Sequence, residues 1–215
     1  MKKVTIQQPK IPHDLPIKQF SITEDPFFKT CMIKDCSITG EEASRLAFDQ
    51  VIFKNVLFEA VSFRDIELTD VIFDHCDLSN ADFSGGIIHR VEFKNSKMLG
   101  IDLSEATLGN VAFFNCQANL SSFRFGRLKQ VRFHECSLET SDFYESMFKN
   151  IHFYRCNLNE ATFANTPLKD IDLSNCTFER LNITMEDLAG CTVSMDQAIG
   201  FARLLGLKIN EREDT

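Results

Sequence analysis

Residues 76–85 read CDLSN ADFSG, and these two five-residue units decide the fold of the chain. Each unit has a large apolar residue in third place, Leu78 and then Phe83, with a small residue two places earlier, Cys76 and then Ala81. A period of five fits neither the 3.6-residue period of an α-helix nor the two-residue period of a β-strand. The stretch therefore belongs to an internal repeat, which must be recognised before any single element is assigned.

The repeat runs without a break from Phe48 to Ile183. Every fifth residue between these ends is apolar, and only Ala118 among them is small. The three outward places of each unit are mostly Asp, Asn, Ser, Thr, Glu, Lys or Arg. Two inward places in five describe one side of a four-sided coil, in which the large residue fills the interior and the small one lies beside it.

A coil of four units predicts that residues twenty apart stack on one another. The sequence contains three such columns: Val51, Val71, Val91, Val111, Val131, Ile151 and Ile171; Phe53, Phe73, Phe93, Phe113, Phe133, Phe153 and Leu173; and Cys36, Cys76, Cys116, Cys136, Cys156 and Cys176. Stacked coils bury one continuous core, and each coil contacts only its neighbours.

The units at 76–80 and 81–85 resemble the repeat of the pentapeptide-repeat family, roughly Ala-Asp/Asn-Leu-x-x. The resemblance covers at least Phe48 to Ile183. It implies an all-β fold, a right-handed quadrilateral β-helix, which we place at residues 28–191 and expect to be followed by a short C-terminal helix.

Residues 1–27 lack the repeat and contain Pro9, Pro12, Pro16 and Pro26. We expect an extended arm and a cap over the first coil, because the end of a solenoid exposes its core and its unpaired strand edge. Farther on, Glu41 and Ala43 occupy inward places, which predicts either a bulged loop or one helical turn at 39–46.

Two places inside the repeat are open to more than one interpretation. Ala118 removes volume from its column, so either the coil is dented or a neighbour fills the space. Pro167 has no N–H group, and the sequence does not decide whether a ladder hydrogen bond is lost there.

The C-terminal region, 192–209, has a different pattern. Ser194 and Gln197 form a capping-box signature, and Gly206 is suited to the end of a helix over Met195 to Leu205. We expect a short strand at 207–209 and a disordered tail at 210–215. The helix either plugs the last coil or forms a dimer. Its similarity to the C-terminal helix of Qnr-like pentapeptide proteins favours a homodimer, with the interface at Met195, Ala198, Ile199, Ala202 and Leu205.

Composition favours a cytoplasmic protein without a membrane span or bound metal. The longest apolar runs are too short to cross a bilayer, and the first residues lack the apolar centre of a signal peptide. All eight cysteines fall on the inward phase of the repeat, with no CxxC spacing, so we interpret them as packing residues in a reducing compartment.

The sequence offers little catalytic chemistry. His75, His89, His134 and His152 lie at outward places with no recurring carboxylate or nucleophile, and no phosphate loop, HExxH or GxSxG motif occurs. We expect no enzymatic activity and no cofactor.

Two adjacent sides of the predicted coil are acidic. Asp77, Asp82, Asp102 and Asp142 precede a large residue, where an Asp side chain commonly bonds its own turn. The better recognition candidates are Glu59, Asp65, Glu105, Glu139, Glu145 and Glu160. The acidic stripe either keeps the rod soluble or mimics DNA.

The resemblance to Qnr-like proteins favours mimicry. It implies binding to bacterial DNA gyrase or topoisomerase IV, modulating the enzyme or protecting it from quinolones or toxins, with no direct contact to nucleic acid. Seven or eight coils, each rising roughly 4.8 Å, would give a rod of roughly 35 Å, about one turn of B-DNA. This chain differs from the loop-bearing Qnr members, because no loop interrupts its coils after Phe48. The alternative is a scaffolding solenoid without a topoisomerase partner.

Overall fold

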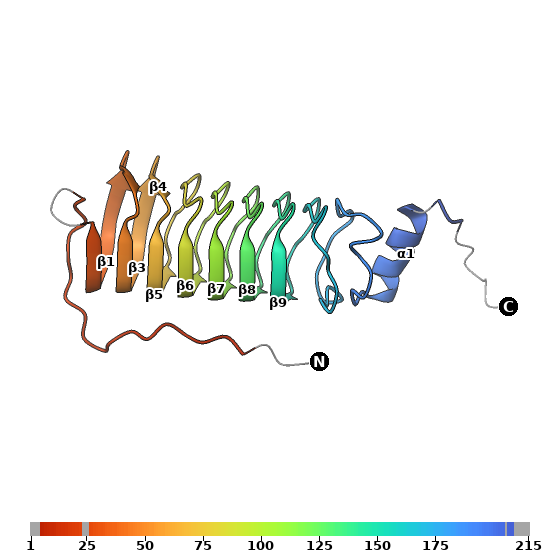
Figure 1. Cartoon of the computed structure of the whole chain (residues 1–215), viewed down its shortest axis with the longest axis horizontal. Coiled ribbons are helices and arrows are strands. Elements are labelled where there is room, and N and C mark those ends of the chain that lie inside the picture. Colours follow the sequence, from red (N-terminus) through yellow and green to blue (C-terminus); the bar gives the residue numbers. More distant parts are fainter. Residues whose placement is uncertain (1–4, 23–25, 205, 209–215) are drawn as a thin grey trace.

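The computed structural model describes residues 5–22, 26–204 and 206–208 and shows a parallel β-solenoid that ends in one short helix (Figure 1). Seven strands form one sheet in the order β1-β3-β5-β6-β7-β8-β9, and β2 pairs with β4 in a second sheet. The predicted all-β solenoid with a C-terminal helix is confirmed. The strands are β1 (Phe27–Thr39), β2 (Glu42–Ser44), β3 (Ala47–Glu59), β4 (Ser62–Arg64), β5 (Glu67–Asp74), β6 (Ile87–Lys94), β7 (Thr107–Phe114), β8 (Arg127–His134) and β9 (Met147–Tyr154), followed by α1 (Met195–Leu204).

The register of the large sheet is twenty residues, as the columns predict. Val51 pairs with Val71, and the same step continues along the valine column to Ile151. The phenylalanine column stacks its rings face to face, with centroid separations of 4.7 Å between Phe113 and Phe133 and 5.1 Å between Phe133 and Phe153. The core is therefore a set of continuous apolar stacks along the solenoid axis.

Left-handed backbone marks the four corners of each coil from Thr30 to Asn165. In one coil these are Asp70 (φ 56°), His75 (φ 55°), Asn80 (φ 57°) and Gly85 (φ 71°). We name the sides of this coil by number and extend the names to residues twenty apart: side 1 is 66–70, side 2 is 71–75, side 3 is 76–80 and side 4 is 81–85.

The prediction of a bulged loop or helical turn at 39–46 is wrong, because this segment contains β2 in a regular coil. Its ladder bonds involve only backbone groups, such as Ser62 N–H to Glu41 O at 3.0 Å, so small or polar side chains at inward places do not disturb it. Ala43 pairs with Phe63. Phe20 from the N-terminal arm lies 5.9 Å from the Phe63 ring and stacks on Phe28 at 5.2 Å, so it caps the first coil.

The N-terminal arm also runs along the solenoid beside the strands, a path that the sequence did not predict (Figure 1). Its backbone bonds to corner residues of sides 1 and 2: Gln7 N–H to Asn110 Oδ1 at 3.1 Å and Lys10 N–H to Asp70 Oδ1 at 2.9 Å. Near β1, Lys18 N–H donates to Met32 O at 2.9 Å. The arm lies against an outward column of side 2 that is unusually apolar and includes Met32, Ile52 and Ile72.

The expected strand at 207–209 is not formed at Leu207 and Lys208, and Ile209 lies outside the described residues. The helix ends in a Schellman motif, in which Gly206 N–H donates to Arg203 O at 2.9 Å and Leu207 N–H to Ala202 O at 3.2 Å. These bonds use the donors that a strand would need, and Gly206 at φ 75° turns the chain away. The expected disordered tail at 210–215 also lies outside the described residues.

The eight cysteines are free thiols, and six of them are buried in the core. Thiols of the stacked column donate to backbone carbonyls, as Cys116 Sγ does to Phe93 O at 3.4 Å. Burial raises the pKa of Cys76 to about 12, so its thiol stays protonated and inert. Ala118 is 1% exposed, so neighbouring groups close the space that its short side chain leaves.

Candidate functional site

Sides 3 and 4 carry the predicted acidic stripe on adjacent faces of the solenoid. Isolated β-bridges pair Asp77 with Leu57 on one side and Lys97 on the other. Another bridge pairs Asp82 with Asp102. The structure thus brings all ten predicted acidic residues onto two neighbouring sides. We call this surface the acidic face; it consists of Glu59, Asp65, Asp77, Asp82, Asp102, Glu105, Glu139, Asp142, Glu145 and Glu160.

Four of these carboxylates form turns, as their position before a large residue indicated. Asp77, Asp82, Asp102 and Asp142 each accept a hydrogen bond from the N–H group two residues later, at 2.8 to 3.1 Å. Three of them also have a basic neighbour: Lys97 at 3.9 Å from Asp77, Arg64 at 3.3 Å from Asp82 and Arg124 at 3.0 Å from Asp142. Their charge is therefore largely used within the solenoid.

The six glutamate and aspartate residues without such turns are better placed for a partner. Glu59, Asp65, Glu105, Glu145 and Glu160 are exposed and Glu139 is half-buried; within the described chain none has a basic side chain within 4.0 Å. Asp65, Glu105 and Glu145 share one corner column of side 4. The arm lies against side 2 and leaves this corner uncovered.

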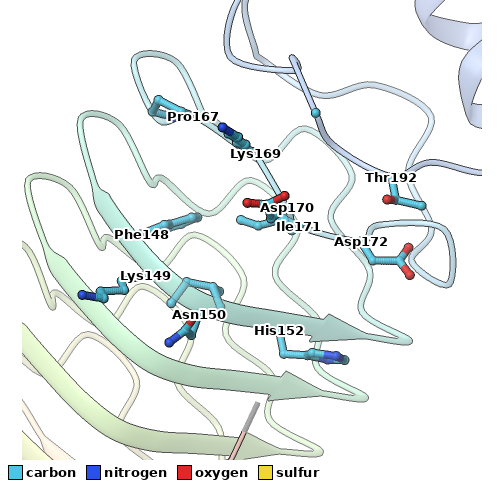
Figure 2. A pocket seen from close by; sticks show the side chains of 12 residues that line it. Phe148, Lys149, Asn150, His152, Pro167, Lys169, Asp170, Ile171, Asp172 and Thr192 are labelled. Carbon is cyan, nitrogen blue, oxygen red and sulfur yellow. The ribbon is translucent and has the colours of Figure 1, made fainter. Parts of the chain in front are cut away.

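A second feature is a cavity of about 630 Å³ beside β9. Figure 2 shows Lys149, Asn150 and His152 on β9 facing Pro167, Asp170 and Asp172 on the following coil. In earlier coils the residue at the place of Pro167 donates to the carbonyl of the preceding coil, as Met147 N–H does to Gly126 O at 2.8 Å. Pro167 cannot, which answers the question that the sequence left open: the ladder bond is lost.

The loss extends beyond one bond. Residues 169–170 form a turn where earlier coils have a strand, and in the described chain β8 is the only strand that pairs with β9. Phe148, at a core position, is consequently only partly buried and lines the cavity. Burial, followed by the nearby Arg132 charge, lowers the pKa of His152, so its ring is neutral at pH 7. The cavity thus lies at an open strand edge and is lined by both basic and acidic side chains.

The third feature is the C-terminal end. The predicted capping box is present, with Gln197 N–H to Ser194 Oγ at 3.2 Å and Ser194 N–H to Gln197 Oε1 at 2.8 Å. Gln197 Nε2 also donates to Leu173 O at 3.0 Å, and Phe201 packs 5.8 Å from Phe178. The helix thus seals the last coil with one face.

The other face of α1 is apolar and open. Met195 is 81% exposed, Ala198 is exposed, and Ile199 and Ala202 are half-buried. A hollow of about 270 Å³ lies between the helix and the last coil, lined in part by Met185, Leu188, Ala198 and Ala202. Leu205, the fifth predicted interface residue, lies outside the described residues.

The repeat, the ladder and the left-handed corners together define the family. A sequence model of the family described as "Pentapeptide repeat region" matches residues 66–143 and 126–197, more than half of the chain. The chain belongs to the pentapeptide-repeat family. Among curated proteins, it is 46% identical over 92 residues to the uncharacterized protein YisX of Bacillus subtilis (strain 168). That match spans 42% of this chain and 43% of YisX, less than half the length of the relative.

Solved structures of pentapeptide-repeat proteins are similar in fold at low sequence identity. HetL, involved in heterocyst differentiation regulation in Nostoc sp. strain PCC 7120, is 16% identical with a TM-score of 0.42 over 78% of this chain and 89% of HetL. A trypsin-treated variant of QnrB1, a plasmid-mediated fluoroquinolone resistance protein, is 19% identical with a TM-score of 0.38 over 85% and 99% of the two chains.

In the described part of the chain, no group of three or more His, Cys, Asp or Glu side chains is placed to hold a metal ion. Among the described residues, no helix is long and apolar enough to span a membrane. The candidate surfaces described above are the acidic face, the cavity beside β9 and the open face of α1.

Proposed function

We propose that this pentapeptide-repeat protein is a non-enzymatic binding protein. It places its acidic face on the basic DNA-binding surface of a bacterial type II topoisomerase, DNA gyrase or topoisomerase IV, in the place of duplex DNA. The observation that carries the proposal is a column of three carboxylates along one uncovered corner of a regular ladder: Asp65, Glu105 and Glu145. Among the described residues, none of the three has a basic side chain within 4.0 Å.

The ladder gives these charges a regular spacing. Each coil advances by about 4.8 Å, so Glu105 and Glu145, two coils apart, are separated by about 10 Å along the axis. A DNA-binding surface neutralises phosphates with Lys and Arg, and it responds to a rigid row of negative charge. Because the ladder already fixes the backbone of the row, binding has to order only the side chains.

The C-terminal helix α1 supports a dimer, in which the acidic face that mimics DNA would be longer. An open apolar face with Met195 and Ala198 at its surface fits a second copy of the chain, joined tail to tail. Such a homodimer would double the length of the acidic face. The expected partner is cytoplasmic, so the protein would act in the cytoplasm.

The proposed activity is competition with DNA. Purified gyrase should lose supercoiling activity as the protein is added, and added DNA should restore it. A second series with ciprofloxacin asks whether the protein also reduces drug-stabilised cleavage. Unchanged supercoiling and cleavage at micromolar protein would contradict the proposal and leave a scaffolding role.

A further inference from the structure

Two corners of the acidic face carry side chains that the local backbone does not favour. Leu120 has φ 60° and Phe125 has φ 58°. Among the described non-glycine residues with positive φ, these are the two with large apolar side chains. Left-handed backbone is unfavourable for such residues, whereas Gly and Asn adopt it readily. Other left-handed corners carry Asn or Gly, as at Asn80 and Gly100, or polar and charged residues such as Gln50 and Arg90.

These two side chains are not used to fill the core. Leu120 is 60% exposed and Phe125 is 45% exposed, so their apolar surface contacts water. They occupy consecutive corners at the two ends of side 4 in the same coil. Packing of the core therefore explains neither the choice of residue nor its exposure, and exposed apolar side chains that gather in one place are candidates for a binding contact.

The neighbours of Phe125 form an ordered cluster. The Tyr144 ring meets Phe125 edge to face at 5.7 Å and 89°. The Arg124 guanidinium lies 5.4 Å from the Phe125 centroid and 5.0 Å from the Tyr144 centroid, and Asp142 holds it at 3.0 Å. Leu99, 44% exposed, lies one coil earlier at the end of side 3.

We call Leu99, Leu120, Arg124, Phe125 and Tyr144 the corner patch. Aromatic and Arg side chains in an ordered apolar cluster are typical of residues that carry most of the energy of a protein interface. The Arg124 side chain is already fixed by Asp142, so a partner would not have to immobilise it.

Carboxylates surround the corner patch. Phe125 lies in the corner column between Glu105 and Glu145. The Leu120 N–H donates to the backbone carbonyl of Glu139 at 2.9 Å, so Glu139 is the residue beside Leu120 on the next coil. An acidic rim repels nucleic acid and anionic lipid and favours a basic protein surface. The occupant that fits is thus a basic protein surface with an apolar recess.

We propose that the corner patch anchors the protein in an apolar recess within the basic DNA-binding surface of the topoisomerase. This inference rests on the proposed function and adds a recognition element that duplex DNA does not have. The carboxylates then supply long-range attraction, and the corner patch supplies a contact that salt does not screen.

The test uses the double variant Leu120→Asn/Phe125→Asn in the full-length chain. Because Asn is favoured at left-handed corners, the variant should melt at or above the temperature of the wild type. Its affinity for purified gyrase should fall at least tenfold. The slope of log affinity against log salt should not change, because no charge is removed. Ala60→Asn, at an exposed corner of the same column as Leu120 with φ 50°, is the matched control and should retain affinity.

The outcomes separate the two claims. Binding by the wild type together with affinity of the double variant within twofold would overturn the corner patch and leave the proposed function standing. No binding by the wild type would overturn both. If the Asn variant melts early, Leu120→Gly/Phe125→Gly repeats the test with the residue present at Gly85 and Gly100. Normal affinity of that folded variant also overturns the inference.

Discussion

The Asp70 carboxylate accepts two hydrogen bonds from the Arg90 guanidinium, Nε to Oδ1 at 2.6 Å and Nη2 to Oδ2 at 2.7 Å. The same Oδ1 accepts the Lys10 N–H of the arm at 2.9 Å. Burial, the largest influence, would raise the pKa of Asp70, but the bonds from Arg90 and Lys10 outweigh it and hold the pKa below its usual value. One charged side chain thus joins two coils to the arm.

Asp70→Asn should loosen the arm and destabilise the solenoid by about 2–3 kcal/mol, because Arg90 loses a charged partner. Limited proteolysis should cut within residues 5–22 faster than in the wild type. Asp49→Asn, which removes a partly exposed pair with Lys29 at 3.2 Å, is the control and should change stability by less than about 1 kcal/mol. Equal cleavage of Asp70→Asn and the wild type would contradict this role.

The same carboxylate predicts a pH dependence. A carboxyl whose pKa is lowered by folding stabilises the fold fully above its unfolded pKa, near 3.9, and loses that contribution as the pH falls through the folded value. The stability difference between the wild type and Asp70→Asn should therefore be constant from about pH 5 to 7 and shrink below about pH 4. Thermal melting across this range measures it, and a constant difference down to pH 2 would exclude the mechanism.

Phe133→Ala should destabilise the solenoid by about 3–5 kcal/mol, because it empties the middle of a continuous ring stack. Phe133 is fully buried between Phe113 and Phe153. Phe125→Ala removes an equal side chain from the surface and should cost about 1 kcal/mol or less. Denaturant unfolding compares the two, and near-wild-type stability of Phe133→Ala would show that the core register is wrong.

The open edge of β9 should exchange its amides quickly. The large residue of a unit commonly donates to the next coil, as Leu168 N–H does to Asp187 O at 2.8 Å, but Phe148 N–H has no such acceptor among the described residues. We expect hydrogen exchange at Phe148 to be at least about tenfold faster than at Leu128, its counterpart in β8. Equal protection of the two amides would mean that the cavity closes in solution.

Ala198→Arg should convert a dimer into a monomer without changing the circular dichroism of the solenoid, because it puts a charge on the open face of α1. Arg203→Ala, at an exposed place in the last turn of the same helix, should leave the dimer intact. Light scattering with size exclusion measures both. A wild type that is already monomeric at micromolar concentration would contradict the tail-to-tail dimer.

Much of this fold could be predicted from the sequence, because the core is periodic. Each inward place repeats the same burial requirement, so the register followed from Phe53, Phe73 and their successors. The path of the arm could not be predicted, since the bonds of Gln7 and Lys10 are single polar contacts without a periodic signal. The apolar outward column Met32, Ile52 and Ile72 was the one available clue to it.

The candidate site was predictable to a smaller extent. The sequence placed the carboxylates on two adjacent sides, because side assignment follows from the twenty-residue period. It did not reveal the corner patch, although Leu120 and Phe125 are the two large apolar residues at left-handed corners that otherwise carry Gly, Ala, polar or charged residues. The cavity beside β9 depends on how a whole coil responds to Pro167, which no local pattern encodes.

The central claim is that the acidic face replaces DNA on a topoisomerase. The most direct measurement is the affinity of purified gyrase for two charge-reversal variants across a salt series. One variant reverses three carboxylates and the other reverses two lysines. Reversal of Glu105, Glu139 and Glu145 to Lys should weaken binding strongly and flatten the salt dependence, whereas reversal of Lys129 and Lys149 on side 1 to Glu should leave binding unchanged or strengthen it. Equal effects from the two sets, or affinity independent of salt, would contradict DNA mimicry.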